Sequence, residues 1–130
     1  MEYTIPPYVG AFSAGEAREQ CQKEGGTLAR VVDFVDNDKL LDILLRYKRD
    51  RATLGAVRVG EGWEWQDNHD EEWKFDNWAV GQPDNKLDRC SEMWTTGEWN
   101  DIPCGDGPRA YFCQVTGDSD AEKTSPDRTL

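Results

Sequence analysis

The sequence is poor in histidine, in closely spaced cysteines and in positive charge, and each scarcity excludes a class of function. His69 is the only histidine, and we expect it to be a solvated turn residue. The four cysteines show no CxxC spacing, which argues against a structural zinc site. Asp and Glu number 26 against 15 Lys and Arg, and the net charge of −11 disfavours nucleic acid and anionic membranes as partners.

The composition that remains is that of one small globular domain. A chain of 130 residues buries roughly two thirds of its unfolded surface, and 37% hydrophobic with 32% charged residues is globular rather than disordered. No apolar run reaches membrane-spanning length, so we predict no membrane insertion. Paired cysteines would place the protein in an oxidising, extracellular compartment, although no secretory signal is visible at Met1.

Four cysteines permit three disulfide connectivities. We adopt Cys21–Cys113, which closes most of the domain, together with Cys90–Cys104, which clamps the polar segment near the end of the chain. In the chain-entropy model the longer loop contributes about 4–5 kcal/mol.

The chain divides into a helical first half and a β-rich second half. Ser13 and Glu16 form a capping box that predicts a helix to about Glu24, with Ala14, Ala17 and Cys21 on its buried face. A second helix is expected from Asp36 to about Lys48. Its predicted apolar stripe is Leu40, Leu41, Leu44, Leu45 and Tyr47.

Short apolar segments broken by turn residues predict the strands. We expect them at 8–12, 53–58, 63–66, 90–95, 97–101 and 109–115. The polar segment 67–89 is long enough for a functional loop. We expect core packing for the tryptophans at 63, 65, 73 and 78, a domain over 1–115, and a disordered tail over 116–130.

These features together resemble the C-type lectin domain. The resemblance covers residues 8 to 114. It rests on Gly81-Gln82-Pro83-Asp84-Asn85, Trp99-Asn100-Asp101 and the spacing of the four cysteines. It implies an α+β fold with two helices, two small antiparallel sheets and a long calcium-binding loop region, and it supports the disulfide pairing adopted above.

Carried over residue by residue, the resemblance implies one calcium ion. Its ligands would be Gln82, Asp84, Asp88, Asn100 and Asp101, all of which offer the oxygen atoms that Ca²⁺ prefers. The family's proline at this point is cis when calcium is bound, so a cis bond is expected at Pro83. The accessory calcium site of the family is broken here, because its positions fall near Arg58, Asn85 and Arg89, leaving only Glu61 and Asp88 suitable.

The same resemblance implies a ligand class. Two neighbouring sugar hydroxyls would meet Gln82, Asp84, Asn100 and Asp101, with Gln82 and Asn100 donating and Asp84 accepting. In the family, the order Gln-Pro-Asp accompanies galactose or N-acetylgalactosamine rather than mannose. Trp94 is the candidate to stack on the sugar, with packing beside the sheet as the equal alternative.

Three departures from the family pattern change local expectations. Asp88 stands where most members have Glu, so the side chain is one methylene shorter. Asn85-Lys86-Leu87 replaces the aromatic and Gly-rich stretch of many galactose binders. Thr53 replaces the tryptophan that usually opens its strand, so we expect the core to differ there.

Other functions remain to be weighed against the lectin interpretation. An enzyme is disfavoured because the cysteines are expected to be paired and His69 has no triad context. A protein-binding or ice-binding domain of the same fold, with calcium only ordering the loop, is the main alternative. The basic segment from Arg46 to Arg51 is expected to be a solvated helix end, with an acidic partner or sulfated glycan as the less favoured interpretation. One shallow sugar site binds weakly, so avidity calls for clustered sites, for which a homodimer is one arrangement.

Overall fold

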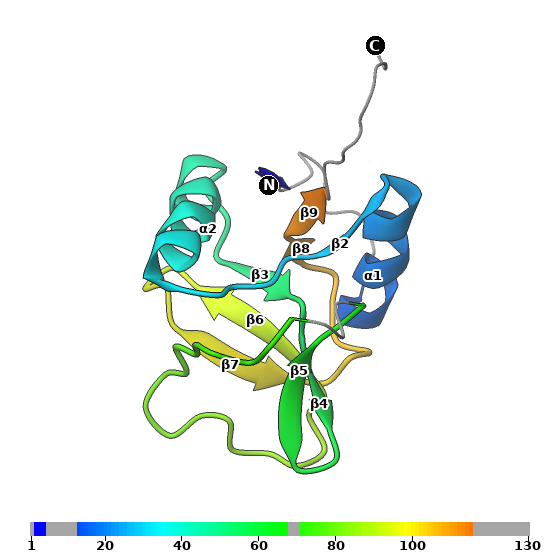
Figure 1. Cartoon of the computed structure of the whole chain (residues 1–130), viewed down its shortest axis with the longest axis vertical. Helices are drawn as coiled ribbons and strands as arrows, with labels where there is room; N and C mark the ends of the chain where they lie inside the picture. The colour runs from blue at the N-terminus through cyan, green and yellow to red at the C-terminus, as the bar shows by residue number, and fades with distance from the viewer. Residues whose placement is uncertain (1, 5–12, 68–70, 116–130) are drawn as a thin grey trace.

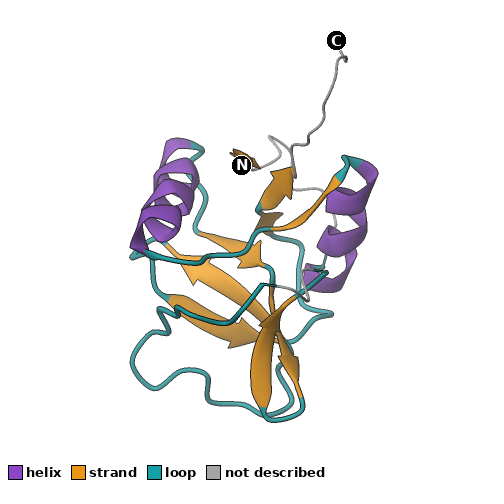
Figure 2. Cartoon of the chain, in the orientation of Figure 1, coloured by secondary structure: helices purple, strands orange, loops and turns teal. Residues whose placement is uncertain are grey.

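The computed structural model describes residues 2–4, 13–67 and 71–115. The predicted strand at 8–12, His69 and the predicted tail from Thr116 lie outside these residues. Two helices lie on opposite sides of three small sheets, and the long loop runs along the far end of the molecule (Figures 1 and 2). The predicted α+β fold is therefore confirmed, with three sheets where we expected two.

Helix α1 spans Ala14–Lys23 and begins as predicted. Ser13 Oγ accepts a hydrogen bond from the Glu16 backbone nitrogen at 3.2 Å, and Glu16 Oε1 accepts one from the Ser13 nitrogen at 2.8 Å. Ala14, Ala17 and Cys21 are buried. This face packs against β2 (Gly26–Leu28), a strand that we did not predict because Gly25 and Gly26 suggested only a helix stop.

Helix α2 spans Phe34–Arg46 and begins two residues before the predicted start, because Asp33 and not Asp36 is its N-cap. Leu40 and Leu44 are fully buried. The rest of the predicted stripe was partly wrong, since Leu45 is 51% exposed and Tyr47 is 47% exposed. A period of 3.6 residues places Asn37 on the buried face instead, one turn before Leu40.

The predicted strand at 53–58 is two strands in different sheets, β3 (Arg51–Leu54) and β4 (Ala56–Val59). Gly55 separates them. A Cβ at this position would lie 2.7 Å from the Ala29 carbonyl oxygen and 2.8 Å from that of Leu28, so only glycine allows β3 to turn this close to the preceding segment. β4 forms a hairpin with β5 (Gly62–Trp65).

The central sheet has the order β7-β6-β3-β8 and carries the polar residues of interest. Its strands are β6 (Cys90–Trp94), β7 (Trp99–Ile102), β3 and β8 (Ala110–Tyr111), with β3 and β8 parallel. The third sheet places β9 (Cys113–Val115) between β1 (Glu2–Thr4) and β2. The predicted strand at 109–115 is therefore split at Phe112.

The two faces of the central sheet differ in chemistry because successive side chains of a strand point to opposite sides. Ala52, Met93 and Trp99 share one face and belong to the main core with Leu40 and Leu44. The opposite face carries Arg51, Glu92, Trp94 and Asn100. On this face Arg51 pairs with Trp94 and Asn100 pairs with Glu92 in the strand register.

Aromatic rings attach the long loop to the core, which confirms the packing expected of these tryptophans. Trp99 is fully buried, and its ring centroid lies 5.6–6.2 Å from those of Trp65, Trp73, Phe75 and Trp78. Trp63 packs on Trp78 with centroids 4.7 Å apart. Because Trp99 directly precedes Asn100 and Asp101, this aromatic cluster also holds the start of the predicted site in place.

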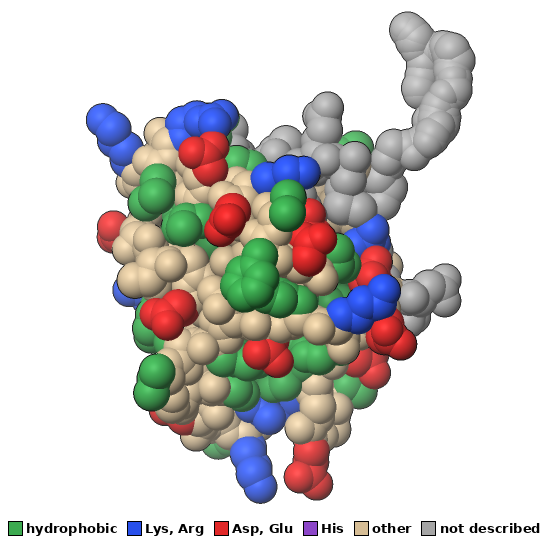
Figure 3. Space-filling view, turned by 60° about the vertical axis from the view of Figure 1, so that its left-hand side comes forward, with side chains coloured by type: hydrophobic (Ala, Val, Ile, Leu, Met, Phe, Trp, Pro, Cys, Tyr) green, Lys and Arg blue, Asp and Glu red, His purple; other side chains and the backbone are tan. Residues whose placement is uncertain are grey.

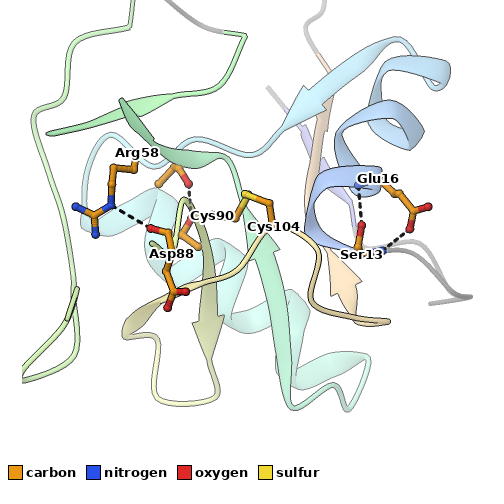
Figure 4. The surroundings of a disulfide bond; sticks show 8 residues. Ser13, Glu16, Arg58, Asp88, Cys90 and Cys104 are labelled. Atoms are coloured by element: carbon orange, nitrogen blue, oxygen red, sulfur yellow. Dashed lines mark hydrogen bonds between the residues drawn. A yellow bond between two sulfur atoms is a disulfide. The ribbon is translucent and has the colours of Figure 1, made fainter. Parts of the chain in front are cut away.

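Both predicted disulfides are present. Cys21–Cys113 joins α1 to β9 across 92 residues, and Cys90–Cys104 joins the start of β6 to the segment after β7 across 14 residues. The second disulfide lies beside Arg58 and Asp88, close to the predicted ligands (Figure 4). Within the described residues, neither helix is long and apolar enough to cross a membrane.

Candidate functional site

Four of the five predicted calcium ligands meet at one point. One end of the Gln82 side-chain amide lies 3.0 Å from Asn100 Oδ1, 2.8 Å from Asp101 Oδ1 and 2.9 Å from Asp84 Oδ1. With Nε2 at this end, all three oxygens lie within hydrogen-bond distance of Gln82, which has two hydrogens to donate among them. The loop after Gly81 and the end of β7, which are 16 residues or more apart in sequence, are thus brought together.

The Gln82–Pro83 peptide bond is cis, as expected from the resemblance. Beyond it, the backbone nitrogens of Asp84 and Asn85 donate to Asp101 Oδ1 at 3.4 Å and Oδ2 at 3.0 Å. Asp101 is 3% exposed, so its buried carboxylate holds the Pro83 turn against the end of β7.

The geometry of this group fits a divalent cation. An amide nitrogen carries two hydrogens, yet three acceptor oxygens face it, so the group has more acceptors than its own donor can satisfy. Rotating the Gln82 amide would present a fourth oxygen at the same point. Two carboxylates and two amide carbonyls are ligands that Ca²⁺ accepts, and water or ligand hydroxyls would complete its six to eight oxygen ligands.

Asp88, the fifth predicted ligand, stays a prediction. Its backbone nitrogen donates to the Asn85 carbonyl at 2.9 Å, and its carbonyl oxygen accepts from Arg58 Nε. Burial, followed by the charges of Asp101 and Asp84, raises the pKa of its carboxyl group. Across the described residues, no three His, Cys, Asp or Glu side chains gather closely enough to hold a metal, so the set depends on the amides of Gln82 and Asn100.

Arg58 occupies the region of the predicted, broken accessory site. Its Nε donates to the Asp88 carbonyl at 3.0 Å (Figure 4). Its Nη2 donates to the Asn85 carbonyl at 3.2 Å and lies 3.7 Å from Asp101 Oδ2. The guanidinium also lies over the Trp63 ring, 4.8 Å from its centroid. A fixed side-chain cation therefore binds the loop oxygens.

Glu92 is the residue of this site that the sequence analysis missed. It is 1% exposed and lies on β6 opposite Asn100. Its Oε2 accepts hydrogen bonds from Asn100 Nδ2 and Trp94 Nε1, both at 2.9 Å. Its Oε1 contacts Arg109 and lies 3.7 Å from Arg51 Nη1. The alternation of Ser91, Glu92 and Met93 looked like an ordinary strand, so only the cross-strand register reveals this role.

Trp94 lies near the predicted site and is partly exposed. It shares Glu92 Oε2 with Asn100, which fixes the edge of its ring beside that ligand. Thr53, fully buried, faces Glu92 from β3, so a small polar side chain stands where the family's tryptophan was expected.

The fold and the site together define a disulfide-linked binding domain with an oxygen-rich, cation-fitting loop. The model of the family described as "Lectin C-type domain" matches residues 11–115, and the chain belongs to this family.

Relatives and solved structures agree with this assignment. The chain is 28% identical to a perlucin-like protein of Mytilus galloprovincialis over 75% of its own length and 67% of that protein. It is 33% identical to a hepatic lectin of Gallus gallus over 68% of its length, and spans 44% of that lectin. It shares the fold of the cow CD23 carbohydrate-recognition domain, solved in the presence of GlcNAc2Man3 oligosaccharide, with a TM-score of 0.74 at 23% identity over 88% of each chain.

Proposed function

We propose that this domain is a calcium-dependent lectin that binds terminal galactose or N-acetylgalactosamine. The observation that supports it most is the convergence of Gln82, Asp84, Asn100 and Asp101 on one point with surplus acceptor oxygens. These are the residues that the family resemblance assigns to the ion and the sugar.

Gln82, Asp84, Asn100 and Asp101 would hold a single calcium ion, with Asp88 as an outer candidate. When bound, Ca²⁺ supplies a positive charge that attracts sugar hydroxyls in place of water. The two negative charges of Asp84 and Asp101 would balance the charge of a divalent ion, and Arg58 Nη2 lies 3.7 Å from Asp101 Oδ2.

The side chains would also contact the sugar directly. Asn100 Nδ2 has two hydrogens and gives one to Glu92, so its second hydrogen can be donated to a sugar hydroxyl. Gln82 supplies a second amide donor, and the exposed Asp84 carboxylate an acceptor. Trp94, oriented by Glu92, offers an apolar ring for the C–H face of galactose.

A second candidate function is a calcium-ordered or calcium-independent domain that binds a protein surface or ice. One observation favours it: Arg58, a cation of the chain itself, binds the loop carbonyls of Asn85 and Asp88. The fold is also shared with a calcium-independent type II antifreeze protein, with a TM-score of 0.73 at 22% identity over 85% of this chain and 82% of that one.

Affinity chromatography separates the two functions. We expect retention on immobilised galactose in calcium, elution by EDTA, and weaker retention on mannose. Asp84→Ala should abolish retention with little effect on the fold, because Asp84 is exposed, its carboxylate contacts the Gln82 amide, and its backbone hydrogen bond to Asp101 is kept. Asn100→Ala is a poorer probe, since it also removes a donor from buried Glu92.

The double variant Gln82→Glu/Asp84→Asn tests the selectivity by reversing donor and acceptor, and should shift preference towards mannose. Lys86→Gln, an exposed change in the same loop, is the matched control. Failure of the unmodified chain on both columns would instead favour the protein-binding or ice-binding function.

The proposed setting is extracellular, consistent with the two disulfides. Because a single shallow site binds a monosaccharide weakly, clustered sites, for example in a homodimer, would supply avidity.

A further inference from the structure

A cavity of about 540 Å³ lies between the end of α2 and the segment before β8. Its nine lining residues include four cations and two carboxylates, in a chain whose acidic residues outnumber its basic ones. The cations are Lys48, Arg49, Arg51 and Arg109, and the carboxylates are Asp50 and Asp106. The sign of charge is therefore reversed locally, and the volume is in the range of small-ligand pockets.

The end of α2 places a lysine at this cavity at a conformational cost. The nitrogen of Lys48 donates to the Leu45 carbonyl and that of Arg49 to the Leu44 carbonyl, so the helix ends in a Schellman motif. Lys48 has a φ of 57° at the position where glycine is usual. Basic side chains gather along the upper edge of the molecule in Figure 3, the end at which α2 finishes in Figure 1.

The cavity is lined by one buried cation and by exposed ones. Arg109 is 8% exposed and contacts both Glu92 and Asp106, so its charge is largely compensated. Lys48 and Arg51 are exposed, and Arg51 Nη1 forms an ion pair with Glu92 Oε1 at 3.7 Å, which is longer than a hydrogen bond. These two side chains can therefore contact an anion from solution.

Glu92 connects the cavity to the proposed sugar site. One of its oxygens is shared by Asn100 and Trp94, and the other faces Arg109 and Arg51. Trp94 is also the direct register partner of Arg51. The cavity cations Arg51 and Arg109 and the proposed ligand Asn100 thus meet at the same buried carboxylate.

We propose that this cavity binds the anionic group, a sulfate ester or a carboxylate, of an acidic galactose-type glycan whose terminal sugar occupies the neighbouring site. The inference rests on the proposed lectin function for its sugar. Apart from that function, it rests on three observations. Cations outnumber carboxylates in the cavity lining, Lys48 has a left-handed backbone conformation at the cavity, and Glu92 contacts residues of both sites. A glycan is favoured over an acidic protein because the cavity shares a buried carboxylate with the proposed sugar site.

The test is titration calorimetry of the whole chain in calcium with galactose, sulfated galactose, a galactose-linked uronic acid, sodium sulfate and polyglutamate. We expect an acidic sugar to bind roughly tenfold more tightly than galactose, since charge-assisted contacts are added. The two acidic sugars distinguish a sulfate from a carboxylate as the preferred group. The gain in affinity of an acidic sugar over galactose should decrease as the salt concentration rises.

The variants are Lys48→Gly, Arg51→Gln and the control Lys39→Gln, an exposed α2 lysine outside the cavity lining. Lys48→Gly suits the left-handed position and should not impair folding, yet it should remove most of the gain and leave galactose binding unchanged. Arg51→Gln should also reduce the gain in affinity for acidic sugars, and Lys39→Gln should leave that gain unchanged.

Equal affinity for acidic and neutral sugars, or a gain that survives in both cavity variants, would overturn the proposal. Variant-sensitive binding of polyglutamate but not of acidic sugars would overturn it in favour of an acidic protein. If neutral galactose fails to bind but acidic sugars bind in EDTA and lose affinity in Lys48→Gly, the cavity stands and the proposed lectin function fails.

Discussion

Arg58 is the residue that decides how far the binding loop depends on a metal ion. Its guanidinium binds two loop carbonyls, approaches Asp101 and lies over the Trp63 ring. A cation is thus provided by the chain itself, where the family resemblance placed an accessory calcium site. The loop should therefore be largely ordered before calcium binds.

Replacing Arg58 by methionine tests this role. Methionine keeps an apolar side chain on Trp63 but leaves the carbonyls of Asn85 and Asp88 without this donor. We expect a loss of about 1–3 kcal/mol in the free energy of unfolding in EDTA, and a smaller loss in saturating calcium, because the ion would restore order to the loop. Thermal unfolding in both buffers measures the difference.

Arg89→Met serves as the matched control, since Arg89 is exposed in the same loop. Its unfolding should differ little from that of the unmodified chain. An Arg58→Met protein with unchanged stability in EDTA would show that the guanidinium contacts contribute nothing to loop order.

At the scale of elements, the helix caps and the alternating strands were readable from sequence, whereas the strand breaks were not. The Ser13 capping box and the buried face of α1 were predicted and are confirmed. The division of one predicted strand into β3 and β4 was missed because nothing local to Gly55 shows that Leu28 and Ala29 approach it.

Gly55→Ala is expected to destabilise the domain by about 1–3 kcal/mol, because the new methyl group would meet two backbone carbonyl oxygens that cannot rotate away. Gly62→Ala is the control in the adjacent hairpin, where the added Cβ would lie 4.0 Å from the Val59 carbonyl oxygen. Urea unfolding of both variants measures the effect. Equal stability of the two would mean that the β3–β4 turn relaxes without cost.

At the scale of the whole molecule, the two disulfides differ in the length of chain that each closes and in their position relative to the proposed site. Cys21–Cys113 closes 92 residues, and Cys90–Cys104 closes 14 residues next to the proposed site. In the chain-entropy model the longer loop contributes about 4–5 kcal/mol and the shorter about 3 kcal/mol.

We therefore expect Cys21→Ala/Cys113→Ala to lower the free energy of unfolding more than Cys90→Ala/Cys104→Ala. The second pair should have the larger effect on calcium and sugar binding, because Cys90 opens the strand that bears Glu92 and Trp94. Guanidinium unfolding and galactose retention of both proteins provide the comparison. The reverse order of stabilities would argue against a loop-entropy origin.

The sequence by itself determined the family, the cysteine pairing that was chosen, and the identity of the proposed ligands, because spacing and residue type are preserved in a linear motif. Gln82, Asp84, Asn100 and Asp101 were all predicted, and the structure brings them together. Asp88 was also predicted and stays a prediction, since the position of its shorter side chain depends on the path of the loop, which Arg58 and Asn85 hold through its backbone.

The tertiary structure alone decided which residues support that motif. Glu92 joins Asn100 to Arg51 and Arg109 only because β7 and β3 flank β6 in a fixed register. The basic cavity exists only because the end of α2 meets the segment before β8, far along the chain. Contacts between distant segments follow from sheet order and packing, which no local pattern of residues encodes.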